Sequence, residues 1–182
     1  MNFIKTKIED VVIIEPKIFF DQRGFFMVCY NNELFALNGI KDTFIQDNIS
    51  KSKKGTLRGM HYQLAPYEQA KIVRVTKGEI FDVAIDVRST SPTYSEWVGI
   101  VLSEKNSKAL YIPAGFAHGF MVLSEEAEVT YKCTAQYNPK ADRSIAWNDP
   151  QIGVDWPDKP DLDLLSEKDT NAPCLCDAEN AF

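Results

Sequence analysis

The stretch LRGMHYQ, residues 57–63, contains His61, one of only two histidines in the 182-residue chain. An imidazole changes charge near neutral pH, so a histidine can take a proton from a substrate and return it. Taken alone, however, a histidine in a strand-like run is more often structural and bonds to a backbone carbonyl. Strand alternation divides the run into two faces, with Leu57, Gly59, His61 and Gln63 on one and Arg58, Met60 and Tyr62 on the other. Gly59 beside His61 would then leave room for a ligand against the sheet.

The residues around His61 do not indicate a metal site. Small β-barrels often bind a metal through two histidines separated by one residue, a carboxylate and a third histidine. Here Gln63 stands two residues after His61, and the only other histidine is His118. We therefore expect no catalytic metal and favour proton transfer by His61, with a carboxylate on its other ring nitrogen. The candidates for that carboxylate are Asp82, Asp86 and Asp169.

These acids also have simpler explanations. SEKD (166–169) fits a capping box, with Ser166 as the helix cap and Asp169 at the third helical position. In IFDVAIDV (80–87), an alternating strand puts Asp82, Ala84 and Asp86 on the face opposite Phe81, Val83, Ile85 and Val87. An acid on the inner face of a barrel would be a site feature, whereas on the outer face it would merely be solvated.

The segment FFDQRGFF (19–26) is typical of a hairpin turn that carries Arg23 between aromatic pairs. A solvated arginine is the commoner case. The alternative is a phosphate clamp, because arginine forks match phosphate oxygens and phenylalanine faces accept a flat base. Arg58 and Lys71 could add positive charge, so the pyrophosphate of a nucleotide sugar would fit without a glycine-rich loop. Taken alone, His118 in IPAGFAHGF and Tyr131 in EVTYKCT are explained as structural residues.

Short β-like runs must position these side chains. They are rich in Val, Ile, Phe and Tyr and comprise residues 11–14, 25–30, 44–49, 71–76, 79–87, 97–102, 109–112, 119–123 and 128–134. Only NNELFALNG (31–39) reads as a clear helix, with Asn31 or Asn32 as its cap and Gly39 at its end. Many strands with little helix between them predict an all-β fold, an antiparallel sandwich or barrel. The length suits a single domain over 1–182, with a barrel core at about 10–148 and a loop-rich C-terminal wrap at about 149–182.

Composition and charge exclude several classes of protein. The net charge of −6 argues against a nucleic-acid partner, because phosphate polymers need a basic face. No apolar stretch approaches the ~18 residues of a membrane span. The first residues lack a basic segment leading into an apolar run, and the four cysteines form no CxxC pair. We therefore expect a cytoplasmic protein without a disulfide framework.

Taken together, the motifs resemble those of the dTDP-4-dehydrorhamnose 3,5-epimerase family. The matching stretches occur in the family's order from the N-terminal strand nearly to the end, and they are FDQRGFF, FIQDNIS, LRGMHYQ, KIVRVTKGEIFDVAIDVR, SPTYSEWVGIVLS, YIPAGFAHGF, EVTYKCT, WNDPQIGVDWP and LSEKD. The resemblance implies a cupin-type antiparallel jelly-roll barrel with a few short helices. It also implies a homodimer that needs no metal or organic cofactor. The family's substrate is dTDP-4-keto-6-deoxy-D-glucose, epimerised at C3 and C5 on the way to dTDP-L-rhamnose.

The resemblance also assigns roles to residues. It implies that His61 is the base, Asp169 its orienting carboxylate and Tyr131 the opposed acid, with Lys71 near the ketone oxygen, where a cation stabilises an enolate. The implied substrate contacts are Arg23 and Arg58 at the diphosphate, Phe19 and Tyr137 at the thymine, and Gln46, Asn48, His118, Asp142 and Lys168 elsewhere. Asp82 would join the polar inner face.

Two positions depart from the family pattern. Val28 stands where the family has a glutamate that contacts substrate, and Asp142-Arg143 stands where Glu-Gly is common. Both departures bear on substrate preference rather than on proton transfer. The alternatives left open are a single-site 3- or 5-epimerase for another deoxysugar nucleotide, a catalytically silent jelly roll that binds a sugar nucleotide, and a metal-dependent cupin enzyme.

Overall fold

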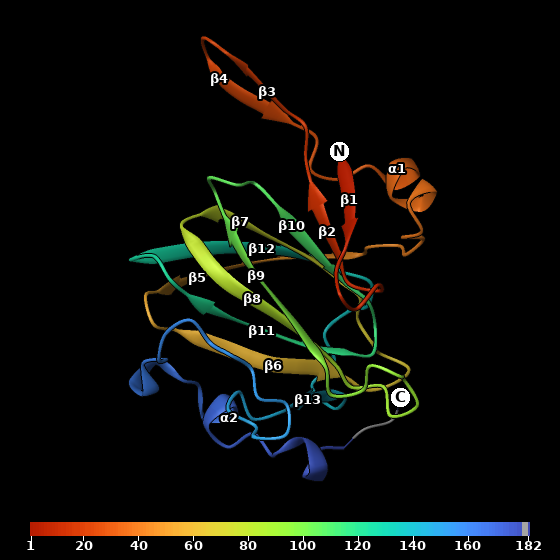
Figure 1. Cartoon of the computed structure of the whole chain (residues 1–182), viewed down its shortest axis with the longest axis vertical. Helices are drawn as coiled ribbons and strands as arrows, with labels where there is room; N and C mark the ends of the chain where they lie inside the picture. The colour runs from red at the N-terminus through yellow and green to blue at the C-terminus, as the bar shows by residue number, and fades with distance from the viewer. Residues whose placement is uncertain (180–181) are drawn as a thin grey trace.

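The computed structural model of the protein describes residues 1–179 and 182. Two antiparallel sheets face each other in it, and a hairpin projects from one end (Figure 1). Within the described residues, one six-stranded sheet has the order β1 (Asn2–Lys5), β2 (Val12–Glu15), β10 (Ala109–Ile112), β7 (Lys71–Lys77), β12 (Glu126–Cys133) and β5 (Gln46–Lys53). The five-stranded sheet has the order β13 (Asp142–Ser144), β6 (Leu57–Gln63), β11 (Phe116–Val122), β8 (Glu79–Asp86) and β9 (Trp97–Ser103). The hairpin consists of β3 (Ile18–Asp21) and β4 (Gly24–Met27). The predicted jelly roll is confirmed.

The core between the sheets is built by inward residues of both. Val73 and Val75 of β7 and Val129 of β12 pack against Ile80 and Ala84 of β8 in one buried cluster. These β-branched and small residues suit facing pleated surfaces, and burying a side chain of this size contributes about 1.5–3 kcal/mol. The apolar contacts between the sheets therefore hold the two walls of the barrel at a fixed separation.

Alternation along β8 agrees with the prediction from IFDVAIDV. Ala84 lies in the cluster between the sheets, whereas Val83 and Ile85 belong to a second cluster with residues of the C-terminal segment, including Leu175. Asp82 is therefore on the inner face, and it is completely buried. The inner face is where an acid that belongs to a functional site is expected from the sequence.

The prediction for β6 was partly wrong. Met60 and Tyr62 do face outwards into the second cluster, but Arg58 and His61 line the same cavity. The pairing of β11 with β6 explains this, because its register shifts between His118, which is opposite His61, and Phe120, which is opposite Arg58. Such an irregularity breaks simple alternation and turns a side chain to the other face.

Two glycines allow β6 and β11 to approach closely at this irregularity. Gly59 has a positive φ of 134°, and a Cβ there would lie 2.5 Å from the Cα of Gly119. A Cβ at Gly119 would lie 2.7 Å from the carbonyl oxygen of Arg58. No other residue fits either place without moving a strand, so the glycine pair fixes how His61 and His118 come to lie side by side.

The helices are short, and α1 (Asn32–Leu37) begins at a cap that the sequence predicted. This cap is Asn31, whose side chain accepts a hydrogen bond from Leu34 N. The C-terminal segment contains η1 (Leu162–Leu164), α2 (Glu167–Thr170) and η2 (Leu175–Asp177), and it lies along the outer face of the five-stranded sheet (Figure 1). Residues 180 and 181 of the predicted wrap lie outside the described residues.

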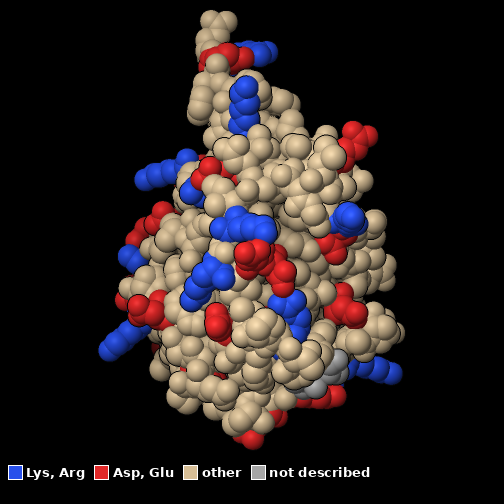
Figure 2. Space-filling model, turned by 45° about the vertical axis from the view of Figure 1, so that its right-hand side comes forward, with Lys and Arg blue, Asp and Glu red and all other residues tan. Residues whose placement is uncertain are grey.

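The β3–β4 hairpin extends away from both sheets (Figure 1). Its phenylalanines are unusually exposed for apolar residues, at 77% for Phe20, 62% for Phe25 and 66% for Phe26. Figure 2 shows the arm as mostly uncharged, with acidic and basic atoms near its tip. An apolar arm of this kind marks an interaction surface.

The close approach of the two glycines predicts a specific instability. Gly59→Ala should lower the free energy of unfolding by about 1–3 kcal/mol more than Gly24→Ala does, because overpacking of this size costs that much. Gly24 is the matched control, since it has a similar φ of 132° but no atom lies within 4 Å of the place that its Cβ would occupy. Urea unfolding followed by tryptophan fluorescence measures the difference. Equal losses in the two variants would contradict the steric account.

Candidate active site

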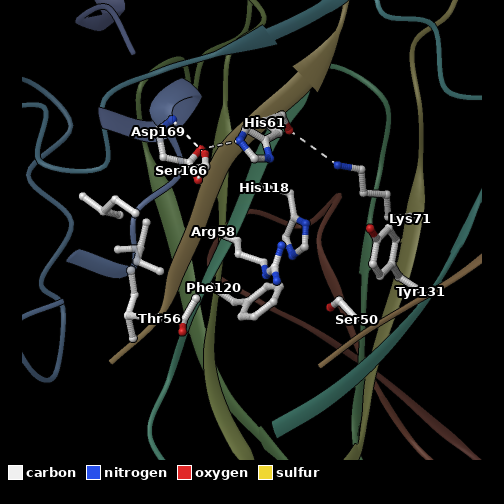
Figure 3. A pocket seen from close by; sticks show the side chains of 13 residues that line it. Ser50, Thr56, Arg58, His61, Lys71, His118, Phe120, Tyr131, Ser166 and Asp169 are labelled. Atoms are coloured by element: carbon white, nitrogen blue, oxygen red, sulfur yellow. Dashed lines mark hydrogen bonds and ion pairs between the residues drawn. The ribbon is translucent and has the colours of Figure 1, made fainter. Parts of the chain in front are cut away.

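A cavity of about 400 Å³ opens between the two sheets beside the C-terminal segment (Figure 3). Its side chains come from three parts of the chain. His61 and His118 belong to the five-stranded sheet, whereas Lys71 and Tyr131 belong to the six-stranded sheet. Asp169 comes from the C-terminal segment. The remaining lining residues are Ser50, Thr56, Leu57, Arg58, Phe120, Leu164, Leu165 and Ser166.

His61 and Asp169 form a tight pair, with 2.6 Å between Nε2 and Oδ1. The His61 side chain is 32% exposed and reaches the cavity, but that of Asp169 is only 2% exposed. Burial acts to raise the pKa of Asp169, yet the hydrogen bond and charge of His61 and the Ser166 hydroxyl outweigh it and hold that pKa below its usual value. An ionised Asp169 accepts the proton of Nε2, so Nδ1 of His61 carries the lone pair.

Asp169 takes part both in the capping box predicted from the sequence and in the hydrogen bond with His61. Ser166 caps α2 by accepting a hydrogen bond from Asp169 N at 3.1 Å, as in the predicted capping box. The same hydroxyl donates to Asp169 Oδ2 at 2.8 Å. The cap therefore fixes the carboxylate that holds His61.

Tyr131 and Lys71 lie on the opposite wall as diagonal neighbours, since Tyr131 pairs with Val73 and Lys71 with Cys133. Burial raises the pKa of Tyr131, so its phenol keeps its proton at neutral pH and can donate it. Burial lowers the pKa of Lys71. Its Nζ lies 3.5 Å from the carbonyl oxygen of His61, at the limit for a hydrogen bond. Among the described residues no carboxylate forms an ion pair with Lys71, so its charge is available to a ligand.

A second cavity of about 370 Å³ adjoins the first and shares His61, Lys71 and Tyr131 with it. It gathers most of the predicted substrate contacts, namely Gln46, Asn48, Tyr137, Asp142 and Lys168. Three of them are linked by hydrogen bonds: Lys168 Nζ donates to Asp142 Oδ2 at 2.6 Å, and the Tyr137 hydroxyl donates to the same oxygen at 3.2 Å.

Arg23 and Phe19 are not brought to these cavities within one chain. Both lie on the projecting hairpin, where the Arg23 side chain is 84% exposed and pairs with Asp21. Their predicted contacts with substrate stay predictions. Of the two departures from the family pattern, Val28 is exposed after the hairpin, and Arg143 pairs with Glu179 of the C-terminal segment.

Sequence reasoning missed several cavity residues. Ser50 continues the inward alternation of Gln46 and Asn48 along β5, so the period of two could have found it. Leu164 and Leu165 lie in the loop-rich segment, where no periodic signal points to the cavity. Gln63 lines the second cavity, but its side-chain amide donates hydrogen bonds to the backbone oxygens of Tyr67 and Gln136 and so stabilises the loops that contain them.

Within residues 1–179 and 182, no group of three or more His, Cys, Asp or Glu residues could hold a metal ion. The same described residues contain no helix long and apolar enough to cross a membrane. What the cavity does contain is a carboxylate-bound imidazole on one wall, with a protonated phenol and a buried ammonium group on the other. These groups can remove a proton next to a carbonyl and supply one from the opposite side. Fold and site thus define a jelly-roll enzyme of the epimerase type.

Comparison with known proteins identifies the family. A sequence model of the dTDP-4-dehydrorhamnose 3,5-epimerase family matches residues 5–177. A curated enzyme of that name from Shigella flexneri is 53% identical over 98% of both chains. The chain therefore belongs to the dTDP-4-dehydrorhamnose 3,5-epimerase family.

Solved structures agree with this assignment. The dTDP-6-deoxy-D-glucose-3,5-epimerase of Legionella pneumophila, in complex with dTDP-4-keto-L-rhamnose, superposes with a TM-score of 0.91 at 48% identity, covering 96% of this chain and 93% of that one. A 3'-monoepimerase from Streptomyces bikiniensis, in complex with dTDP-quinovose, has a TM-score of 0.88 at 34% identity, covering 94% and 87%. Enzymes with different numbers of epimerised carbons thus share this fold.

The double role of Ser166 leads to a prediction about pH. In Ser166→Ala the Asp169 carboxyl should titrate at a higher pH than in the wild type, because it loses a donor that stabilises its charge. The loss of the cap should also cost about 1 kcal/mol of unfolding free energy. In the wild type, the lowered pKa of Asp169 stabilises the fold at pH values above the pKa that this carboxyl has in the unfolded chain. This stabilisation is lost as the pH falls through the folded-state pKa. Because the variant has less of it to lose, its free energy of unfolding should decrease less on acidification.

Carboxyl-carbon NMR of Asp169, together with urea unfolding at several pH values, measures both effects. Ser166→Thr is the matched control, since it keeps the hydroxyl and should leave the titration unchanged. An unshifted titration in Ser166→Ala would show that the hydroxyl does not stabilise the Asp169 charge.

Proposed function

We propose that this enzyme epimerises dTDP-4-keto-6-deoxy-D-glucose at C3 and C5 and forms dTDP-4-keto-L-rhamnose for dTDP-L-rhamnose biosynthesis. The observation that carries the proposal is the placement of His61 with Asp169 on one wall of the cavity and of Tyr131 with Lys71 on the other. The names of the relatives support the choice of substrate.

In the proposed mechanism His61 is the base. Protons on C3 and C5 flank the C4 ketone, so removing either one leaves an enolate whose charge rests on the ketone oxygen. Nδ1 of His61 takes the proton while Asp169 stabilises the imidazolium that forms. Tyr131 then gives a proton to the same carbon from the opposite face, which inverts its configuration.

Lys71 has the role of stabilising the enolate. A buried ammonium group without a carboxylate partner is worth far more to a developing oxyanion than one in water, and comparable donors contribute about 3 kcal/mol. His61, Lys71 and Tyr131 line both cavities, so one sugar can contact all three. No step in this scheme requires a metal ion or an organic cofactor.

The substrate-binding part of the proposal follows from the second cavity. Gln46, Asn48, Asp142 and Lys168 offer donors and acceptors for the sugar, and Tyr137 offers a ring face for the thymine. Arg58 supplies charge for the diphosphate from the first cavity, and His118 lies beside His61. Arg23 and Phe19 would contribute only from a neighbouring subunit.

A single-site epimerase is the second candidate. The structural similarity to the 3'-monoepimerase of Streptomyces bikiniensis favours it, because the same base and acid can serve one carbon or both. A silent sugar-nucleotide-binding jelly roll is the third candidate, and the intact pair of His61 and Asp169 speaks against it.

Proton exchange in heavy water separates these candidates. Incubation with dTDP-4-keto-6-deoxyglucose should place deuterium at both C3 and C5, as read by NMR, with turnover unchanged by exhaustive chelation. His61→Asn should reduce incorporation at both carbons by at least about 100-fold. Tyr131→Phe should still exchange protons, because His61 can return a deuteron to the same face, but it should form no inverted product.

Each alternative has a different signature in this experiment. Deuterium at one carbon alone would establish the single-site epimerase. Absence of deuterium together with tight binding of the nucleotide sugar would leave the silent binding protein. Exchange that survives in His61→Asn would remove His61 from the role of base.

We also propose that the chain acts as one domain over 1–182, in the cytoplasm and as a homodimer. The hairpin exposes Phe20, Phe25 and Phe26, and the six-stranded sheet exposes Ile49 of β5, with Ile45 exposed just before that strand. A second copy of this sheet is an apolar surface on which the arm can lie.

The arm leads to a prediction about assembly. Replacing Phe20 and Phe25 by Asp should convert a dimer into a monomer, because two charges would have to be buried in the interface. Light scattering coupled to gel filtration measures the mass. Leu162→Asp is the control, since Leu162 is also exposed but lies in η1 of the C-terminal segment, and it should leave the dimer intact. A dimer that persists in the double variant would exclude the arm as its main contact.

A further inference from the structure

A second histidine–carboxylate pair lies beside the first, and the proposed proton transfer does not use it. His118 Nε2 lies 2.7 Å from Asp82 Oδ1. The pair is more deeply buried than His61 and Asp169, with side-chain exposures of 7% and 0%. His118 of β11 stands directly opposite His61 of β6, so both imidazoles belong to one wall of the same cavity (Figure 3).

Burial of the Asp82 carboxylate inside the barrel lowers the stability of the fold. Phe120 and Ile100 are its cross-strand neighbours on β11 and β9. Oδ2 is buried and has no hydrogen-bond partner among the described residues. A buried carboxylate with only one of its oxygens bonded destabilises a fold relative to an apolar residue. Its presence is therefore explained by what it does to His118 rather than by a contribution to stability.

The chemistry of the pair determines where the imidazole proton lies. Burial lowers the pKa of His118; Asp82 acts in the opposite direction, and the charges of Lys71 and His61 lower that pKa further. A neutral imidazole has one N–H, and an ionised carboxylate can only accept a hydrogen bond. The proton therefore lies on Nε2, and Nδ1 is left as an acceptor. Nδ1 makes no hydrogen bond within the described residues.

We propose that Asp82 is a positioning residue, which holds His118 in the tautomer whose Nδ1 accepts a hydrogen bond from a hydroxyl of the bound sugar. The hydroxyl's role rests on the function proposed above, whereas the tautomer itself does not depend on any substrate.

The same arrangement gives the two walls of the cavity opposite character. Asp169 fixes His61, and Asp82 fixes His118, so both imidazoles of the five-stranded sheet present acceptor nitrogens. Lys71 and Tyr131 of the six-stranded sheet present donors. The hydroxyls of a bound keto sugar can donate to the imidazole nitrogens while its ketone oxygen accepts from the donors of the six-stranded sheet. This pairing selects one orientation of the sugar, with the ketone near Lys71.

Imidazole NMR of the ligand-free protein tests the tautomer directly, because the chain has only two histidines. Two-bond proton–nitrogen correlations on protein labelled with ¹⁵N-histidine should show His118 protonated on Nε2 alone, and His61→Asn assigns the signals. In Asp82→Leu the Nδ1–H form of His118 should become detectable. A wild-type His118 with its proton on Nδ1, or a tautomer that is the same in Asp82→Leu, would overturn the proposal.

Asp82→Asn is the second variant, in case the leucine variant does not fold. It is nearly isosteric, and it should remove the strongly downfield Nε2–H resonance expected of a bond to a carboxylate. Retention of that resonance would also overturn the proposal. Asp86→Asn is the matched control, because Asp86 is another fully buried acid of β8, but it bonds to Arg88, Ser91 and Thr93. It should leave both histidine spectra unchanged.

Steady-state kinetics then test the hydroxyl contact. A hydrogen bond that persists from bound substrate to transition state contributes to binding uniformly, so Asp82→Leu, which leaves no acceptor for Nε2–H, should raise KM about tenfold and leave kcat within a few-fold. A purely structural role would instead lower the amount of active enzyme and leave KM unchanged. If the tautomer is as expected but the wild type exchanges no protons, the proposed function fails and the assignment of His118 stands.

Discussion

The hydrogen bond between His61 and Asp169 is the interaction on which the site depends. It joins residues 108 positions apart in the sequence, and together with the apolar packing of Ile152 and Leu175 it holds the C-terminal segment at the cavity. Without the hydrogen bond the imidazole could rotate and exchange tautomers, and the base that we propose would have no defined nitrogen facing the substrate. The carboxylate is in turn held by the cap of a four-residue helix, which also carries Lys168 to the second cavity.

The jelly roll suits this chemistry because its two sheets provide two opposed walls. Inversion at carbon needs a base on one face and an acid on the other, and groups from a single sheet could not reach both faces. Along β7 the inward positions change from Lys71 to Val73 and Val75, and along β12 they change from Tyr131 to Val129. The same strands therefore supply a polar cavity at one end and an apolar core at the other, which keeps the separation of the walls fixed.

Local rules in the sequence predicted much of this architecture. The alternation of β8 placed Asp82 inside, and the caps of α1 and α2 were found from Asn31 and Ser166. Most strand runs were also correct, but β1 and β13 were missed, because they are short and gain their order from pairing with β2 and β6. The prediction of the sheet face on which Arg58 lies was wrong, because the register shift opposite Gly59 depends on Gly119, which is far away in the chain. The proximity of Asp169 to His61 came only from the resemblance to a family.

The buried charges show how the protein divides stability and function. Asp82, Lys71 and Asp169 are all within the interior of the chain, where each would destabilise the fold if it stood alone. Asp169 is offset by three donors, two from Ser166 and His61 side chains and one from the backbone of Gly59. Asp82 and Lys71 are only partly offset; Lys71 lines the cavity, whereas Asp82 lies behind it against His118. The ammonium group of Lys71 is therefore placed where a ligand can complete its interactions, whereas Asp82 acts on a ligand only through His118.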